Sequence, residues 1–249
     1  MKWSSLCAFF GLAACANRSR PTPLPDTIQA RRALLDRMTN TAEPAVLFVG
    51  NSYSFGLPSA LSNIAATRGK KLRVGHSTYG GWTLERHASH APTLRKIRDG
   101  RWDVVVIQEQ SQLPAMSSKA YTTKMFPPVK QLAAEAQANG AIPVLYQTWG
   151  RRDGDKTSRG DDFQAMNLRL RNGYTAAAKH AGGIVIVPVG DAWENEVMAG
   201  RGSSLFLDDG SHPSQAGIRL NAEIFYQTFF GTPSGDFAHS NGTNDQATR

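Results

Sequence analysis

The sequence predicts an α/β fold in which one parallel β-sheet of five strands is covered by helices on both faces. Three observations lead to this expectation. Five short apolar runs are rich in β-branched residues, the stretches between them carry helical spacing, and 41% of the 249 residues are hydrophobic. This composition supports a buried core and excludes a chain that is disordered throughout. Strands that alternate with helices in this way are typical of a parallel sheet.

Each of the five apolar runs has the length of a single strand. Continuous apolar runs are expected where a strand is buried on both faces, as in a parallel sheet with helices on either side. The predicted strands cover residues 45–49, 72–77, 104–107, 142–146 and 184–189. No internal repeat is found.

The intervening stretches carry helix signals. Leu57, Leu61 and Ile64 fall on one helical face, and Gly69 supplies a stop. Two further helices are predicted over residues 128–138 and 163–179, each followed by a glycine that can end a helix. These helices are the crossovers that a parallel sheet needs.

The ends of the chain predict an exported protein with one folded domain over residues 26–231. Residues 1–14 combine Lys2 with an apolar run too short to span a bilayer, as in a signal peptide. The string LAAC at residues 12–15 resembles the bacterial lipobox, which implies cleavage before Cys15 and acylation of its thiol. An ordinary secretory signal cut nearby is the alternative. Residues 15–25 are expected to form a tether and residues 232–249 a disordered tail.

We therefore expect the protein in the bacterial cell envelope, anchored by lipid at the periplasmic face, or secreted. A lipid anchor is the only membrane contact expected. The two cysteines, Cys7 and Cys15, lie in the first fifteen residues, so the domain holds no disulfide framework, thiolate zinc site or catalytic thiol. The net charge of +8 permits anionic partners, but its basic residues are dispersed and no recognition motif accompanies them. No nucleic-acid partner is expected.

Polar, compact side chains follow all five predicted strands. In a parallel sheet, ligands bind beyond the carboxyl ends of the strands, because the strand-to-helix loops converge there. The loops that follow the strands are residues 50–54, 79–83, 108–111, 147–152 and, beyond a short helical stretch, 208–213. We expect the functional site to be built from these loops.

Ser52, His212 and Asp209 are the candidate catalytic residues. A serine hydroxyl becomes nucleophilic when a base takes its proton, and a histidine base needs a carboxylate to hold its tautomer and stabilise its cation. One turn can place Asp209 and His212 toward the same site, with Pro213 at the first position of a following helix. Either segment alone also fits a turn serine or a capping pair. Their occurrence together at strand exits favours catalysis.

The string VLFVGNS at residues 46–52 resembles the first signature block of the SGNH (GDSL-like) hydrolases. Gly81 matches the glycine of that family's second block, and Asp209 and His212 match its last block. The resemblance covers roughly residues 45–230. It implies a flavodoxin-like three-layer α/β/α sandwich that carries a serine esterase.

The third block departs from the family pattern. The family's asparagine is absent there, and glutamines stand at positions 108, 110 and 112. By resemblance to carbohydrate acetylesterases, Gln108 is the expected third donor of an oxyanion hole, beside the backbone N–H groups of Ser52 and Gly81, with Gln110 as the alternative. If all three glutamines point elsewhere, the chain is a candidate for a non-catalytic relative.

Three further residues are assigned to substrate binding. Trp149 and Arg151 follow the fourth strand, where an aromatic platform and a positive charge suit a sugar ring that bears an acid, and Tyr53 adjoins Ser52. A buried tryptophan and a surface arginine are the alternative. His87 and His90 lie three apart on a predicted helix, but no third ligand accompanies them, so a structural role is favoured. We expect no metal and no organic cofactor.

Together these features predict an exported serine esterase that removes an acetyl or other small acyl group from a carbohydrate. Its partner would be an acylated small molecule or carbohydrate. Two alternatives remain open: an SGNH-like lipase or thioesterase acting on long chains, and a non-catalytic glycan-binding lipoprotein. The sequence does not specify the sugar, the acyl group or the oligomeric state.

Overall fold

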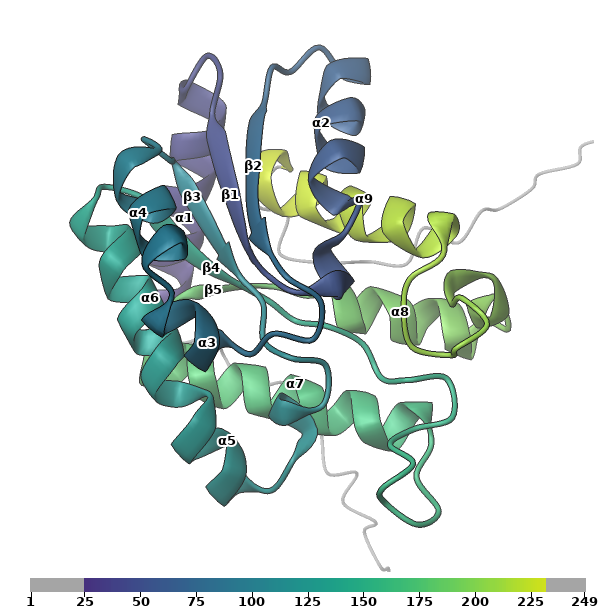
Figure 1. The fold of residues 1–249 in the computed structure, drawn as a ribbon. Helices are drawn as coiled ribbons and strands as arrows, with labels where there is room; N and C mark the ends of the chain where they lie inside the picture. The colour runs from purple at the N-terminus through teal and green to yellow at the C-terminus, as the bar shows by residue number, and fades with distance from the viewer. Residues whose placement is uncertain (1–24, 232–249) are drawn as a thin grey trace, which may run out of the picture.

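A computed structural model describes residues 25–231 of the chain. The expected signal peptide, the acylation site Cys15, the tether up to residue 24 and the C-terminal tail lie outside the described residues. Five parallel strands form one sheet in the order β2-β1-β3-β4-β5 (Figure 1). The strands are β1 Ala45–Gly50, β2 Arg73–Thr78, β3 Val104–Ile107, β4 Ile142–Tyr146 and β5 Val185–Val187.

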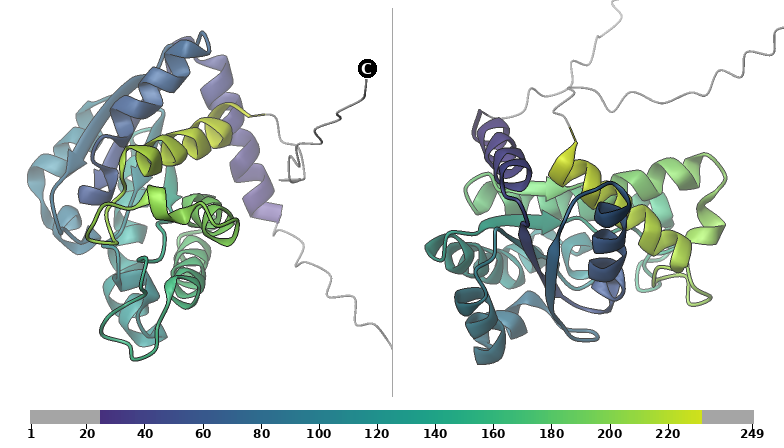
Figure 2. Two further views of the ribbon diagram at one scale, coloured as in Figure 1. Left: turned by 90° about the vertical axis from the view of Figure 1, so that its right-hand side faces the viewer. Right: turned by 90° about the horizontal axis from the view of Figure 1, so that it is seen from above.

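Helices cover both faces of this sheet, which confirms the predicted three-layer α/β/α fold (Figures 1 and 2). The strand order is that of the flavodoxin-like class. The helices are α1 Pro25–Asn40, α2 Leu57–Thr67, α3 Leu84–Ser89, α4 Ala91–Asp99, α5 Ser118–Lys124, α6 Phe126–Ala138, α7 Phe163–His180, α8 Val189–Met198 and α9 Gln215–Phe230. Three short 3₁₀ helices join them: η1 Ser52–Ser54, η2 Leu113–Ala115 and η3 Gly202–Leu205.

Alternation of side chains along the strands divides the core in two. On β1, Val46 and Phe48 pack with α1, α2, α8 and α9, whereas Leu47 and Val49 pack with α3, α4, α6 and α7. Successive side chains of a strand point to opposite faces, so both faces of an apolar run are buried when helices lie on each side. The buried strands therefore hold the carboxyl-end loops in fixed positions.

Two element boundaries differ from the predictions in ways that affect the site. The fifth strand is shorter than predicted, because Pro188 has no N–H to donate and α8 begins at Val189. The last helix begins at Gln215, since the Ser214 hydroxyl accepts the N–H groups of the first turn. Pro213 instead pairs with Phe206 in an isolated antiparallel bridge. His212 is thus held in a short loop ahead of the helix.

No helix between residues 25 and 231 combines the length and the apolar character that a membrane span requires.

Candidate active site

Ser52 lies at the first position of η1, directly after β1. Asn51 caps this turn, because its side-chain oxygen accepts the backbone N–H of Tyr53 at 3.1 Å. Gly50 is required before the turn, since a Cβ at this position would fall 2.4 Å from Oε1 of Gln108. Because Gln108, which follows β3, lies so close, no residue with a side chain fits at position 50.

The structure brings Ser52, His212 and Asp209 together in one chain of contacts. Oγ of Ser52 lies 2.9 Å from Nε2 of His212, across 160 positions of sequence. On the other side of the ring, Nδ1 of His212 lies 2.5 Å from Oδ2 of Asp209. An imidazole that carries its proton on Nδ1 donates to the carboxylate and accepts the serine proton on Nε2. This is the geometry that activation of a serine hydroxyl requires.

Asp209 also shapes the loop that carries His212. Its second carboxylate oxygen accepts the backbone N–H groups of Ser211 at 2.8 Å and His212 at 2.9 Å. Burial raises the pKa of Asp209, but the hydrogen bonds from His212 and Ser211 outweigh it and lower the pKa to about 2. The carboxylate therefore stays ionised at any ordinary assay pH. The side chains of Asp209 and His212 keep 47% and 38% of their surface exposed, so both are accessible from solvent.

The backbone N–H groups of Ser52 and Gly81, the residues expected to form the oxyanion hole, have no acceptor within the part of the chain that the structure describes. Gly81 has φ of +71°, a left-handed conformation that glycine adopts without strain, and nothing lies within 4 Å of the place where its Cβ would be. The loop after β2 thus offers a free donor beside open space.

Gln108 does not supply the third donor that the sequence analysis assigned to it. The side chain is fully buried, and its Oε1 accepts the N–H of Asn51 at 2.9 Å and the hydroxyl of Ser54 at 3.0 Å. Its amide nitrogen donates to Oδ1 of Asn51 and to the carbonyl of Glu109. Both ends of the amide are therefore used to hold the turn that carries Ser52.

The two other glutamines are arranged differently. Oε1 of Gln110 accepts the N–H groups of Gln112 and Leu113, and its Nε2 makes one long contact of 3.4 Å with the Ser111 hydroxyl. The Gln112 amide donates to Asp155 at 3.2 Å. Of the three glutamines, Gln110 keeps the donor that is least engaged.

Trp149 and Tyr53 are buried, which corrects their assignment as substrate contacts. Trp149 is fully buried, stacked between the rings of Tyr53 and Trp193, and Tyr53 is only 2% exposed. Both rings hold Ser211 instead, because Trp149 Nε1 donates to its carbonyl at 3.1 Å and the Tyr53 hydroxyl lies 2.5 Å from its Oγ. They therefore position the neighbouring His212. The role of Ser211 as an anchor gave no signal in the sequence.

Arg151 remains available for a substrate. Its side chain is half-buried and donates to the Ser111 hydroxyl at 3.3 Å, while its Nε is buried without a partner among residues 25–231. No carboxylate of the described chain forms an ion pair with it. The charge of Arg151 helps to lower the pKa of Asp155, but the two side chains do not form an ion pair. A guanidinium that is not engaged in an ion pair can bind an anionic group of a ligand.

The two histidines after the second strand contact hydroxyl and carbonyl groups of the protein. His90 falls in the break between α3 and α4, and Nδ1 of each ring contacts the hydroxyl of Thr93. Nε2 of His87 lies 2.8 Å from the carbonyl of Gly50, and burial lowers the pKa of His87 to about 4. Neutral His87 thus ties α3 to the residue that precedes the Ser52 turn, a structural role.

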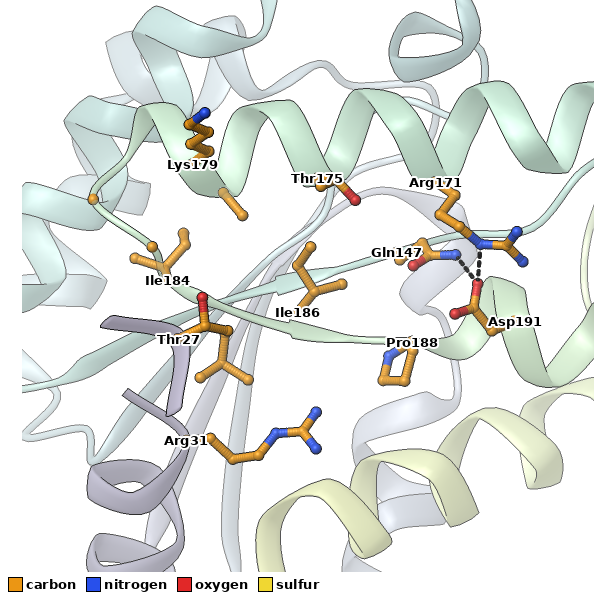
Figure 3. A pocket seen from close by; sticks show the side chains of 14 residues that line it. Thr27, Arg31, Gln147, Arg171, Thr175, Lys179, Ile184, Ile186, Pro188 and Asp191 are labelled. Carbon is orange, nitrogen blue, oxygen red and sulfur yellow. Dashed lines mark hydrogen bonds and ion pairs between the residues drawn. The ribbon is translucent and has the colours of Figure 1, made fainter. Parts of the chain in front are cut away.

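A cavity of about 600 Å³ lies elsewhere, along the free edge of β5 between α1 and α7 (Figure 3). Ile186 and Pro188 form part of its wall, and Thr27 and Arg31 of α1 face them. None of the predicted catalytic or substrate-binding residues lines it. The cavity is therefore separate from the Ser52 site.

Comparison with known proteins decides the family. A solved structure of a protein from Slackia heliotrinireducens, which is described as an SGNH hydrolase, is 32% identical to this chain. The match covers 75% of this chain and 98% of that one, with a TM-score of 0.61. The chain belongs to the SGNH hydrolases. It is therefore an ester-hydrolysing enzyme, as the sequence resemblance predicted.

More distant solved structures share the fold of this SGNH hydrolase. A DUF4886 family protein from Bacteroides uniformis is 19% identical over 75% of this chain and 83% of its own, with a TM-score of 0.66. A catalytic mutant of an acetylxylan esterase from Geobacillus stearothermophilus is 16% identical over 75% of this chain and 94% of its own, with a TM-score of 0.59. Neither a family model nor a curated protein matched the sequence.

The anchoring of His212 by Trp149 predicts a specific effect on catalysis by this SGNH hydrolase. Trp149→Phe keeps a stacked ring but removes the N–H that binds Ser211, so we expect kcat for an ester to fall by about 10-fold with little change in KM. The matched control is Trp193→Phe in the same stack, whose N–H binds Asn221 at 2.7 Å and not the His212 loop. Steady-state kinetics and thermal melts of both variants measure the effect. Equal kcat in the two variants would contradict the anchoring role.

Proposed function

We propose that this SGNH hydrolase is an exported serine esterase that removes acetyl groups from a carbohydrate through Ser52, His212 and Asp209. The observation that carries the proposal is the 2.9 Å contact between Oγ of Ser52 and Nε2 of His212. The carboxylate on the far side of the ring supports it, because a serine–histidine pair needs an orienting acid.

In the proposed reaction, Oγ of Ser52 attacks the ester carbonyl while Nε2 of His212 takes the hydroxyl proton. The imidazolium returns that proton to the leaving sugar alcohol as the C–O bond breaks, which leaves an acyl group on Ser52. A water molecule then attacks the acyl carbon, His212 takes a proton from it, and acetate leaves as Ser52 is reprotonated. Asp209 holds the ring and stabilises its positive charge in both halves of the reaction.

The carbonyl oxygen becomes negative in both steps and needs hydrogen-bond donors. The unpartnered N–H groups of Ser52 and Gly81 support an assignment as two of them. Because Gln108 is fully engaged inside the fold, we assign the third donor to the amide of Gln110.

Two observations support a carbohydrate ester as the substrate class. The catalytic imidazole and carboxylate are partly exposed, so a bulky alcohol has room beside them. One fold relative is an acetylxylan esterase. Arg151, which has no carboxylate partner within the described chain, is the proposed contact for an acidic group on the sugar.

The central test compares Ser52→Ala with Ser54→Ala, a substitution in the same turn whose hydroxyl binds Gln108 and not His212. Ser52→Ala is expected to lower kcat/KM for a short-chain nitrophenyl ester by roughly four to six orders of magnitude. The Ser54→Ala enzyme should keep turnover within about 10-fold of wild type.

The same assay separates the substrate classes. Wild-type enzyme should release acetate from an acetylated oligosaccharide and act poorly on long-chain nitrophenyl esters, and a fluorophosphonate should label Ser52. Preference for long chains would favour a lipase or thioesterase. Saccharide binding without turnover or labelling would favour a glycan-binding protein and would contradict the proposal.

A second prediction concerns the oxyanion hole. Gln110→Glu keeps the oxygen that accepts the N–H groups of Gln112 and Leu113 but removes the amide donor. We expect kcat to fall by about 100-fold, the usual loss for one such donor. Gln112→Met removes the amide two residues later without placing a second carboxylate against Asp155, and should leave kcat near the wild-type value. If Gln110→Glu is no slower than Gln112→Met, the third donor lies elsewhere.

The proposed location follows from the first fifteen residues, which lie outside the described part of the chain. Full-length protein produced in a bacterium should fractionate with membranes and carry lipid on Cys15. Cys15→Ser should abolish lipid labelling and release the protein from the membrane fraction. Membrane association that survives this substitution would show that the anchor is not the Cys15 thiol.

A further inference from the structure

Glu109 is a buried acid that the proposed reaction does not use. It lies two residues beyond the end of β3, between Gln108 and Gln110, and its side chain has no exposed surface. One carboxylate oxygen, Oε2, has no hydrogen-bond partner among residues 25–231. A buried carboxylate with an unpartnered oxygen costs stability, and such groups are concentrated at functional sites.

The other carboxylate oxygen joins two loops of the active site. Oε1 of Glu109 accepts the backbone N–H of Leu84 at 3.0 Å and that of Gln110 at 2.7 Å. Leu84 is the first residue of α3 and lies three positions after Gly81. Gln110 carries the amide that we assign as the third oxyanion donor. A single atom thus fixes the distance between the loop of Gly81 and the loop of Gln110.

The same loop is tied to the Ser52 turn from its other side. Nδ2 of Asn51 donates to the carbonyl of Trp82 at 3.1 Å, directly after Gly81. The segment from Gly81 to Leu84 is therefore held at one end by the residue before Ser52 and at the other by Glu109. Movement at the Glu109 end would therefore displace the segment that carries the Gly81 N–H.

We propose that Glu109 is a positioning residue, whose ionised carboxylate aligns the donors on Gly81 and Gln110 with the negative oxygen of the reacting ester. The proposal rests on the function proposed above, because it concerns the oxyanion hole of that reaction. An ionised carboxylate is a stronger acceptor of N–H groups than a neutral carboxyl group. The alignment is therefore tightest when Glu109 is charged.

The surroundings of Glu109 place the ionisation of its carboxyl group in a pH range that an assay can cover. Burial raises the pKa of Glu109 to about 7, the N–H groups of Gln110 and Leu84 oppose the rise, and the charge of Glu85 on α3 adds to it. From α7, the Tyr174 hydroxyl accepts the backbone N–H of Glu109 at 3.3 Å, and burial keeps that phenol protonated by raising its pKa.

The test is Glu109→Gln, which keeps the shape and an accepting oxygen but removes the charge. Between about pH 5.5 and pH 8.5, on either side of the Glu109 pKa of about 7, we expect a pH-dependent ratio of wild-type to variant kcat. The ratio should be near 1 at the acid end and rise to about 10-fold to 100-fold at the alkaline end, with similar KM values. Any pH dependence that does not involve position 109 is common to both proteins and cancels in the ratio.

A ratio that is constant across this pH range, or equal turnover at the alkaline end, would refute the role of Glu109. Either result would leave the assignment of Ser52 intact, since Ser52→Ala tests that separately at a single pH. Full activity of Glu109→Gln at the acid end also shows that the variant folds.

A second variant keeps the proposal testable if Glu109→Gln melts below the assay temperature. Glu85→Gln is an exposed change that removes the neighbouring negative charge and so lowers the pKa of Glu109. The rise in kcat should then occur at lower pH than in wild type, with the same plateau. If the rise in kcat of Glu85→Gln occurs at the same pH as in wild type, the ionisation of Glu109 is not its cause.

Discussion

The contact between Ser52 and His212 is the constraint on which the rest of the site depends. The two residues are 160 positions apart, and only the first lies at the end of a sheet strand. His212 belongs to a loop between η3 and α9, so the sheet does not place it directly. It is placed through contacts with the exit of β4, where Trp149 donates to the Ser211 carbonyl and the Arg152 N–H donates to the carbonyl of Gly210 at 2.8 Å.

Beyond the carboxyl edge of the sheet there are no hydrogen bonds between strands, and buried polar side chains hold the segments together instead. Gln108 binds both the backbone and the side chain of Asn51, His87 binds the carbonyl of Gly50, and Glu109 binds the N–H of Leu84. Each contact joins residues that lie at or beyond the carboxyl ends of different strands. In a low-dielectric interior, satisfied hydrogen bonds of this kind are strong and directional. The loops of the site are therefore fixed relative to one another, although loops are usually the most mobile parts of a fold.

The sequence was sufficient to predict the sheet and the place of Ser52 for a physical reason, whereas Asp209 and His212 were matched through the family resemblance. β-Branched runs buried on both faces specify strands, and parallel strands deliver their following loops to one edge, which is where Ser52 lies. The direction of a single side chain at that edge is not encoded in the same way. Gln108 turns inward because glycine at position 50 leaves room for it, and Trp149 is buried because two other rings stack on its faces. Those neighbours are distant in sequence, so no local pattern predicts them.

The residues of the proposed site differ in their exposure to solvent, and this difference would favour an ester of a large alcohol. The groups that orient the catalytic residues are buried, whereas His212 and Asp209 keep 38% and 47% of their side-chain surface exposed. Electrostatic interactions strengthen as water is excluded, so the pair works best when something covers it. In a site without a covering segment among the described residues, the substrate itself is the available cover. A sugar ring over His212 would exclude water from His212 and Asp209 while its ester oxygen receives the proton. A small alcohol would leave both side chains exposed to water. Turnover that increases with the size of the alcohol, at constant acyl group, is the behaviour that this geometry favours.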